Sequence, residues 1–215
     1  MTDAPSSRSR VKRMHERGAY DQATVHAILD AQPIAHVAYV LDGAPVVTPT
    51  LQWREGNYIY WHGSAASRML ETSEGAEVCV AVTLIDAFVM ARSAFHHSCN
   101  YRSVMVFGKA CKVIDPAAKM ARLKAFTERL FPGRWDTLRP ATAKEVKATT
   151  VLGLALDEAS AKVRSGPPGD DEEDYALPIW AGLLPVRMQV LPPVDDPRLA
   201  QGLSAPDHVR KFSIG

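Results

Sequence analysis

Two hydroxyls and a guanidinium gather shortly after a strand-like run, at Ser64, Ser67 and Arg68. The aromatic run Tyr58–Trp61 is typical of a strand, His62-Gly63-Ser64 interrupts it, and Ala65–Glu74 is typical of a short helix. The first N–H groups of a helix have no partners inside it, and its dipole makes that end positive. These residues therefore predict a phosphate-binding site. An ordinary helix capped by Ser64, with a surface arginine, would explain the same pattern.

A second set of cations, Arg92, Arg102 and Lys109, lies in a strongly apolar region. Basic side chains in such surroundings need anionic partners. A bound phosphate is one candidate partner, and Asp86 is an alternative partner for Arg92.

Other familiar chemistry is absent from the sequence. His96 and His97 are adjacent, so in a strand they would point to opposite faces and chelate a metal poorly. The sequence contains no GxSxG, HExxH, Walker or GxGxxG pattern. This pattern favours a protein that positions a cofactor rather than one that builds a catalytic triad or a metal centre of its own.

The composition limits the classes of partner. Among 215 residues, 25 Lys and Arg balance 24 Asp and Glu, so no general basic field would attract nucleic acid. The longest apolar stretch is too short and too polar to span a membrane, and no apolar signal segment opens the chain. Three cysteines without CxxC spacing favour a reducing compartment. We therefore expect a cytoplasmic protein without nucleic-acid or membrane partners.

Turn signals divide most of the chain into short strands. A helix over 22–31, capped by Asp21, precedes strands at 34–41, 45–53 and 58–61 that form an antiparallel meander. Two further strands are expected at 76–84 and 87–93, separated by Ile85-Asp86, and a long strand at 101–113. Helices over 117–130 and after Thr142, and strands near 149–156 and 159–164, complete the domain. Many short strands with turns between them predict a mainly β fold, a closed barrel with peripheral helices.

The same signals divide the chain into segments. We expect a flexible basic segment at 1–18, a single domain at 19–190 and a tail at 191–215. The proline-rich, acidic stretch 166–175 is expected to be a surface loop of the domain.

Several segments in order resemble a known family. They are RGAYD (17–21), WHGSAASRML (61–70), ARSAFHHSCNYRSVMVFGKA (91–110), FPGRW (131–135), ASAKVRSGPPGDDEEDY (159–175) and PIWAGLLP (178–185). Together they resemble the pyridoxamine 5′-phosphate oxidase-related flavoproteins, in the branch that includes nitroimidazole-resistance proteins. The resemblance implies an FMN-binding split β-barrel, a homodimer with FMN at the subunit interface, and a small-molecule substrate.

The resemblance also implies site residues. It assigns the FMN phosphate to Ser64, Ser67 and Arg68, with His62 and Gly63 at the strand end where the cofactor enters. A second wall for the phosphate, ribityl chain or flavin edge is formed by Arg92, Ser93, Tyr101, Arg102 and Ser103. Trp180 resembles the residue that approaches the flavin from the partner chain.

Two classes of function remain open at this point. The first is an FMN-dependent oxidoreductase that passes electrons to a small electron-poor acceptor such as a nitro-aromatic compound. The second is a non-catalytic flavin-binding or redox-sensing protein, or a split barrel that binds haem or a deazaflavin. The pyridoxal substrate of the true oxidases is not favoured, because their substrate-binding pattern is not matched.

Apolar residues on both faces of the strands favour the homodimer independently. The runs VCVAV (78–82) and VMVF (104–107) give each strand two apolar faces, and only one can lie inside a barrel. A second copy of the chain would cover the other face.

Overall fold

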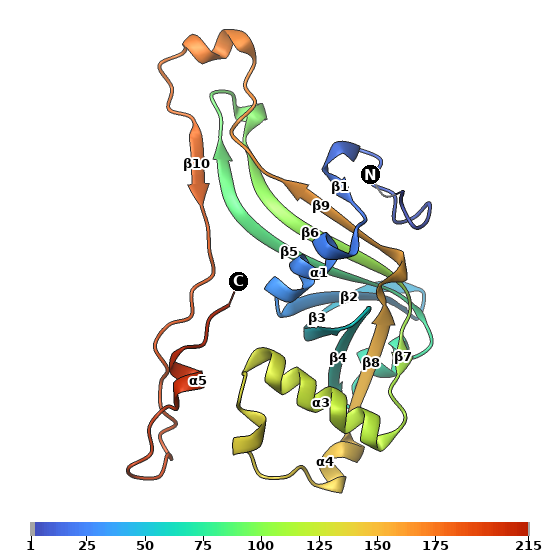
Figure 1. Cartoon of the computed structure of the whole chain (residues 1–215). Coiled ribbons are helices and arrows are strands. Elements are labelled where there is room, and N and C mark those ends of the chain that lie inside the picture. Colours follow the sequence, from blue (N-terminus) through green and yellow to red (C-terminus); the bar gives the residue numbers. More distant parts are fainter. Residues whose placement is uncertain (1–2, 215) are drawn as a thin grey trace.

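The structure is a computed structural model that describes residues 3–214 (Figure 1). The helices are α1 (Gln22–Ala31), α2 (Arg68–Ser73), α3 (Pro116–Leu130), α4 (Ala143–Ala148) and α5 (Asp207–Arg210). The strands are β1 (Gly18–Ala19), β2 (Ile34–Leu41), β3 (Ala44–Glu55), β4 (Tyr58–Ser64), β5 (Glu77–Met90), β6 (Ser98–Lys109), β7 (Cys111–Lys112), β8 (Thr149–Ala155), β9 (Ala159–Arg164) and β10 (Gly182–Pro185). Short 3₁₀ turns occur at His15–Arg17, Ala94–His96, Trp135–Thr137, Leu156–Glu158 and Glu172–Ala176.

The predicted meander is confirmed. β2, β3 and β4 pair antiparallel in sequence order. Asp42 and Gly43 both have positive φ, 51° and 78°, which is the conformation that a tight hairpin turn requires. Pro49 pairs with His36 of β2, whereas β4 pairs with β3 only at Gln52–Glu55. Among the described residues, no strand lies on the other side of Pro49, so its missing N–H removes no hydrogen bond to a second neighbour.

One strand interruption closes the sheet into a barrel. The strand order is β1-β9-β6-β5-β2-β3-β4-β8-β7. β7 begins one residue after β6 ends, at Ala110, and β9 follows β8 directly. β6 pairs with β9 while β7 pairs with β8, so the last strand of the sheet is the continuation of β6. The predicted mainly β, split-barrel fold is confirmed.

Two predicted strand boundaries were wrong. The strands expected at 76–84 and 87–93 are one strand, β5, whose pairing with β6 shifts between Ile85 and Ala87. Asp86 is the extra residue of this bulge, and a bulge bends a strand without ending it. β4 likewise continues through His62-Gly63-Ser64, because β8 pairs with it as far as Ser64.

The helices cover the barrel ends and one outer face. α1 begins as predicted, with the Asp21 carboxylate accepting a hydrogen bond from the Thr24 amide, and it buries Val25, Ile28 and Leu29 against the barrel interior. α3 lies outside, where its Leu123 and Phe126 pack on a second cluster of Trp53, Tyr60 and Val151. α4 has the predicted capping box between Thr142 and Glu145.

α2 is shorter than the sequence pattern predicts. It begins at Arg68 with Ser67 as its N-cap, although no side-chain hydrogen bond caps it. Ser64 instead closes a turn before the helix, where its carbonyl accepts a hydrogen bond from the Ser67 amide at 2.9 Å.

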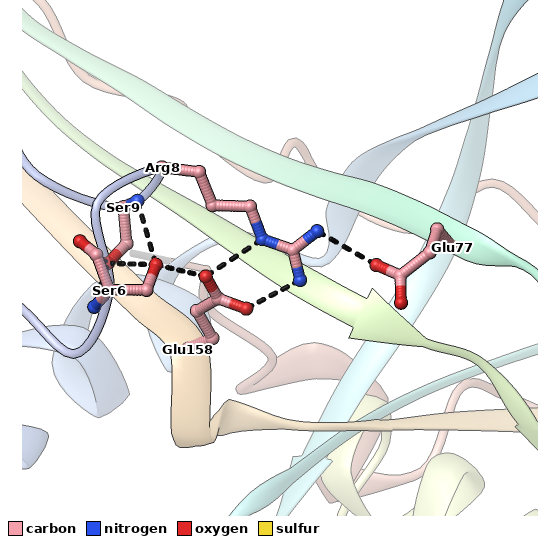
Figure 2. Close-up of polar contacts among 5 residues, drawn as sticks. All are labelled: Ser6, Arg8, Ser9, Glu77 and Glu158. Carbon is pink, nitrogen blue, oxygen red and sulfur yellow. Dashed lines mark hydrogen bonds and ion pairs between the residues drawn. The ribbon is translucent and has the colours of Figure 1, made fainter.

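The two ends of the chain differ in their contacts. Near the N-terminus, Arg8 binds Glu158 through two nitrogens and Glu77 through a third, and Ser6 also binds Glu158 (Figure 2). The other end leaves the barrel as an extended arm in which β10 pairs with β5, and the tail then returns beside the body (Figure 1). The division into a flexible start, one domain and a tail stays a prediction.

Gly153 of β8 generates a prediction about packing. A Cβ there would lie 2.6 Å from Cε1 of Tyr60. Because Tyr60 is held between Trp53 and α3, Gly153→Ala should destabilise the fold by about 1–3 kcal/mol, as overpacking does. Urea unfolding measures the change. Gly169→Ala is the control, because its Cβ would meet nothing within 4 Å. Equal stability of the two variants would contradict the packing argument.

Candidate functional site

The strongest candidate site lies between β4 and α2. Arg68 is exposed, and within residues 3–214 its side chain has no hydrogen-bond or ion-pair partner. Arg68 pairs with neither Glu71 nor Glu74, and Glu74 binds Lys112 instead at 2.9 Å. The Ser67 hydroxyl is not used as a cap, and the Ser64 hydroxyl accepts only a 3.3 Å hydrogen bond from the Ala66 amide. These three side chains can therefore receive an anion without breaking any existing ion pair.

The two residues just before this site have structural roles in the single chain. The His62 ring lies on the outer face of β4 and packs edge-on against Phe126, with ring centroids 4.4 Å apart. Burial lowers the pKa of His62, which therefore favours the neutral imidazole. Gly63 faces the barrel interior, where an added Cβ would lie 3.1 Å from Cδ1 of Leu70. Gly63 lets α2 pack close to β4. The His62 side chain lies on the opposite face of β4, away from α2.

Arg92 and Ser93 are held by an aspartate from the acidic loop. The Asp170 carboxylate accepts hydrogen bonds from the Arg92 amide at 2.8 Å and from its guanidinium at 3.0 Å. The Ser93 amide approaches the same carboxylate, and the Arg92 guanidinium also lies 4.8 Å from the Tyr175 ring centroid. The alternative partner expected for Arg92, Asp86, was therefore wrong, and the partner is Asp170.

The acidic stretch 166–175 is mostly exposed, as expected of a surface loop, but one of its acidic side chains is enclosed. The Asp170 side chain is fully buried. Burial raises its pKa, but the hydrogen bonds from Arg92 and Ser93 outweigh that effect, so the pKa of Asp170 lies below its usual value. The carboxylate stays charged and fastens the loop to the end of β5.

The remaining candidates on β6 are also engaged. Arg102 binds Asp86 at the β5 bulge through two nitrogens, with the shortest distance 2.7 Å. This ion pair raises the pKa of Arg102. The Ser103 hydroxyl donates to the Lys162 carbonyl at 3.3 Å, and Tyr101 pairs with Ile85 and Arg164 through the backbone. Neither predicted cation of this wall is free.

Trp180 lies on the extended arm and is 65% exposed. Its ring folds back over Gly182, where an added Cβ would lie 2.9 Å from the indole. The arm thus exposes a large aromatic side chain to solvent in the single chain.

One chain does not bring all the predicted residues together. The Ala110 backbone exchanges hydrogen bonds with Gly75 and Ala76, directly after α2, whereas Tyr101 and Arg102 lie toward the other end of β6. From Tyr101 to Ala110 the chain advances by nine residue steps, a path of about 30 Å along the strand. Ser64, Ser67 and Arg68 therefore form one group, and Arg92, Ser93, Tyr101, Arg102 and Ser103 lie elsewhere.

Two further features were not expected from the sequence. A cavity of about 480 Å³ lies between the β5 bulge and the returning tail, and Asp86, Arg102, Met188 and Phe212 are among its lining residues. Potential metal-ligating atoms of His96, Asp170 and Asp174 lie within 4.8 Å of one another. Asp170 already binds Arg92, whose positive charge opposes a cation there. No sequence signal distinguishes Asp170 among the acids of its run.

The sequence comparison identifies the family. A family model described as pyridoxamine 5′-phosphate oxidase matches residues 21–163, which span the barrel from α1 to β9. The chain belongs to this family. No curated protein matches the chain.

Solved structures give closer relatives. The flavocytochrome Anf3 from Azotobacter vinelandii is 51% identical over 100% of both chains, with a TM-score of 0.96. An FAD and heme binding protein from Mycobacterium smegmatis is 38% identical over 92% of this chain and 98% of its own, with a TM-score of 0.88. A protein of Bacteroides thetaiotaomicron described as a 5-nitroimidazole antibiotic resistance protein is 19% identical over 68% of this chain and 86% of its own, with a TM-score of 0.56, which shows the fold alone.

A separate observation concerns membranes. Within residues 3–214, no helix has the length and apolar character needed to cross a bilayer.

The Asp170 contacts generate a pH prediction. The pKa of Asp170 is lower in the folded chain than the ordinary aspartate value of 3.8. Its contribution to the stability of the folded loop is therefore present above pH 3.8, and it is lost as the pH falls through the lowered pKa of the folded chain. We expect hydrogen–deuterium exchange in 166–176 to increase in Asp170→Asn at neutral pH, and in the wild type only in acid. Asp171→Asn is the control, since the hydrogen bonds and the ion pair of Arg92 among the described residues go to Asp170 and not to Asp171. Unchanged exchange in Asp170→Asn would contradict the anchoring role.

Proposed function

We propose that this chain is a flavin- and haem-binding oxidoreductase of the flavocytochrome kind. The single observation that carries the proposal is the 51% identity to the flavocytochrome Anf3 over the whole of both chains. The relative with 38% identity, described as binding FAD and haem, supports the same pair of cofactors. A flavin exchanges electrons in pairs or singly and haem iron exchanges one, so together they can pass electrons to a small electron-poor acceptor.

The flavin phosphate is assigned to Ser64, Ser67 and Arg68. Arg68 is available to a phosphate because it has no partner among the described residues, whereas Arg92 and Arg102 are occupied by carboxylates. A guanidinium suits a phosphate because it can donate two parallel hydrogen bonds. The residues of this chain would bind and orient the flavin by its phosphate, leaving its ring to other contacts.

The identity of the flavin is the point on which the sequence and the relatives differ. The family resemblance implies FMN, and the absence of a GxGxxG fingerprint for a dinucleotide was a further reason to expect it. That fingerprint belongs to doubly wound α/β folds, so its absence from a β-barrel does not distinguish FMN from FAD. The relative described as binding FAD favours FAD, and FMN is the competing proposal.

We further propose that the protein is a homodimer with its flavin sites between two copies. The arm from Leu177 to Leu191 exposes a series of large apolar side chains. It extends away from the barrel of its own chain (Figure 1). The outward side of β2 and β3 is also apolar, with Val40 and Val47 exposed. A second copy would cover both surfaces, and it would bring the Trp180 arm to a flavin held at Arg68.

Cofactor content tests the proposal directly. The purified protein should show both flavin absorption and a Soret band, and denaturation should release a flavin that chromatography identifies as FAD or FMN. A protein that takes up neither flavin after reconstitution would overturn the proposal. Turnover with a reduced electron donor and an acceptor separates an oxidoreductase from a storage or sensing protein.

Arg68→Ala tests the phosphate assignment. The affinity for the flavin found should fall by about 1.5–3 kcal/mol, as expected for loss of a hydrogen bond to a charged group. Riboflavin has no phosphate, so its affinity should be nearly unchanged. Lys144→Ala is the control, because it removes an exposed cation from α4. Equal losses for riboflavin and the phosphorylated flavin would indicate a folding defect and contradict the assignment.

Val47→Glu tests the dimer. Val47 is 59% exposed on the outward face of β3, and a carboxylate there should disfavour a buried contact between copies. Sedimentation at low micromolar protein should show a smaller mass for Val47→Glu, and flavin should strengthen the wild-type dimer. Ile114→Glu is the control, since Ile114 is 81% exposed in the loop before α3. A wild-type monomer with full flavin affinity would contradict the proposed interface.

A further inference from the structure

A cavity of about 530 Å³ lies between the N-terminal segment and the start of α1. Small-molecule sites commonly have volumes of about 300–1,000 Å³, so this cavity is large enough for such a ligand. Part of its wall is 18–21, from the RGAYD segment, and the rest comes from residues 3–15. The proposed function assigns no role to these residues, so the cavity is a separate feature of the chain.

The chain on either side of Arg10 and Lys12 is attached to the barrel. Before them, Arg8 binds two glutamates, one in β5 and one after β8 (Figure 2). After them, the Lys162 ammonium donates a hydrogen bond to the Arg13 carbonyl at 3.1 Å, and β1 pairs with β9. These contacts hold the segment in place as one wall of the cavity, so its two cations stay at the cavity.

Tyr20 joins the two walls of the cavity. Its hydroxyl oxygen accepts a hydrogen bond from the Val11 amide at 2.8 Å, and both residues line the cavity. Among the described residues, the hydroxyl proton of Tyr20 has no acceptor. A tyrosine hydroxyl donates as well as accepts, so Tyr20 can donate to a ligand without losing its bond to Val11. The tyrosine ring and the valine side chain add apolar surface to the lining.

The two cations of this lining are not neutralised. Among the described residues, the side chains of Arg10 and Lys12 make no hydrogen bond or ion pair. Two carboxylates line the same cavity, yet neither pairs with them. Asp21 is the N-cap of α1, where it accepts a hydrogen bond from the Thr24 amide at 2.9 Å and lies at the positive end of the helix dipole. Asp3 is exposed to solvent.

These groups favour a phosphate over a metal ion. Two cations and a hydroxyl proton can all donate to phosphate oxygens, and hydrogen bonds between charged groups are the stronger kind. A metal ion would be repelled by Arg10 and Lys12 and would have to compete with α1 for Asp21. His15 also lines the cavity, and its Nδ1 lies 3.9 Å from the Glu16 carboxylate. The charges of the lining that are not already bonded within the chain are therefore positive on balance.

We propose that this cavity binds a phosphate ester of a small aromatic molecule. Its phosphate would accept hydrogen bonds from Arg10, Lys12 and the Tyr20 hydroxyl. Its aromatic part would lie against the Tyr20 ring and Val11, because aromatic rings pack favourably against one another. The site requires neither flavin nor haem, so the inference goes beyond the proposed function and does not rest on it.

Titration calorimetry of the full chain with phenyl phosphate tests the site. The protein is titrated as purified and again after saturation with flavin, so that a phosphate site at Arg68 does not contribute. Lys12→Ala should weaken binding about tenfold or more, as expected for loss of a hydrogen bond between charged groups. Arg13→Ala is the matched control, because it removes an exposed cation from the same segment but Arg13 is not part of the lining. Tyr20→Phe keeps the ring and should weaken binding about 2–10-fold.

The outcomes distinguish a built site from general charge attraction. Circular dichroism of each variant shows that it folds before it is titrated. Equal losses in Lys12→Ala and Arg13→Ala would overturn the site, as would a wild type that binds no phenyl phosphate at millimolar concentration. Phenol that binds as tightly as phenyl phosphate would contradict the phosphate contacts, and inorganic phosphate that binds as tightly would contradict the aromatic part. Flavin and haem content are measured separately, so failure of the proposed function would leave this inference standing.

Discussion

The junction at Ala110 is the contact on which the rest of the structure depends. It separates β6 from β7. The residues before this break pair with β9, and the residues after it pair with β8. The Ala110 amide donates to the Ala76 carbonyl, and its carbonyl accepts from the Gly75 amide at 2.8 Å. Barrel closure and the end of α2 are therefore fixed by the same peptide, which is fully buried. The position of Arg68, one short helix earlier, follows from this closure.

The second constraint is the surplus of apolar surface. Each barrel strand buries alternate residues inside, but β2, β3, β5 and β6 also carry apolar side chains outward. α3 covers only the outer side of β3, β4 and β8, around Trp53 and Tyr60. Because burying an exposed apolar surface is favourable by about 25 cal/mol per Å², the uncovered face and the apolar arm favour association.

Much of the fold could be predicted from the sequence because local signals agreed. The Asp21 cap, the Asp42-Gly43 turn and the Thr142–Glu145 capping box each fix one boundary, and all three are formed. Prediction failed where pairing with a distant strand overrode the local pattern. Gly63 looked like a strand breaker, yet β8 extends β4 through it. Asp86 looked like a turn, yet β6 pairs on both sides of it and makes it a bulge.

The candidate site was harder to predict because the partners of charged side chains are set by tertiary structure. The sequence placed four cations near the expected phosphate site or in apolar surroundings, and nothing in their spacing distinguishes a free arginine from a paired one. The structure pairs Arg92 with Asp170, 78 residues away, and Arg102 with Asp86 across the bulge. Exposed ion pairs contribute little to stability, but release of Arg92 would leave the enclosed Asp170 carboxylate without its charged partner.

This pairing changes what each cation can do for an anionic ligand. A phosphate that approached Arg92 would have to displace a fully buried aspartate, and one that approached Arg102 would compete with a carboxylate bound through two nitrogens. Arg68 has no such competitor among the described residues, and its neighbours are hydroxyls without strong partners. An anion gains most where the protein has not already neutralised the charge, because no existing hydrogen bond must be broken first. If the proposed function holds, a flavin phosphate would therefore bind at the unpaired arginine beside the end of β4 rather than where the cations are most numerous.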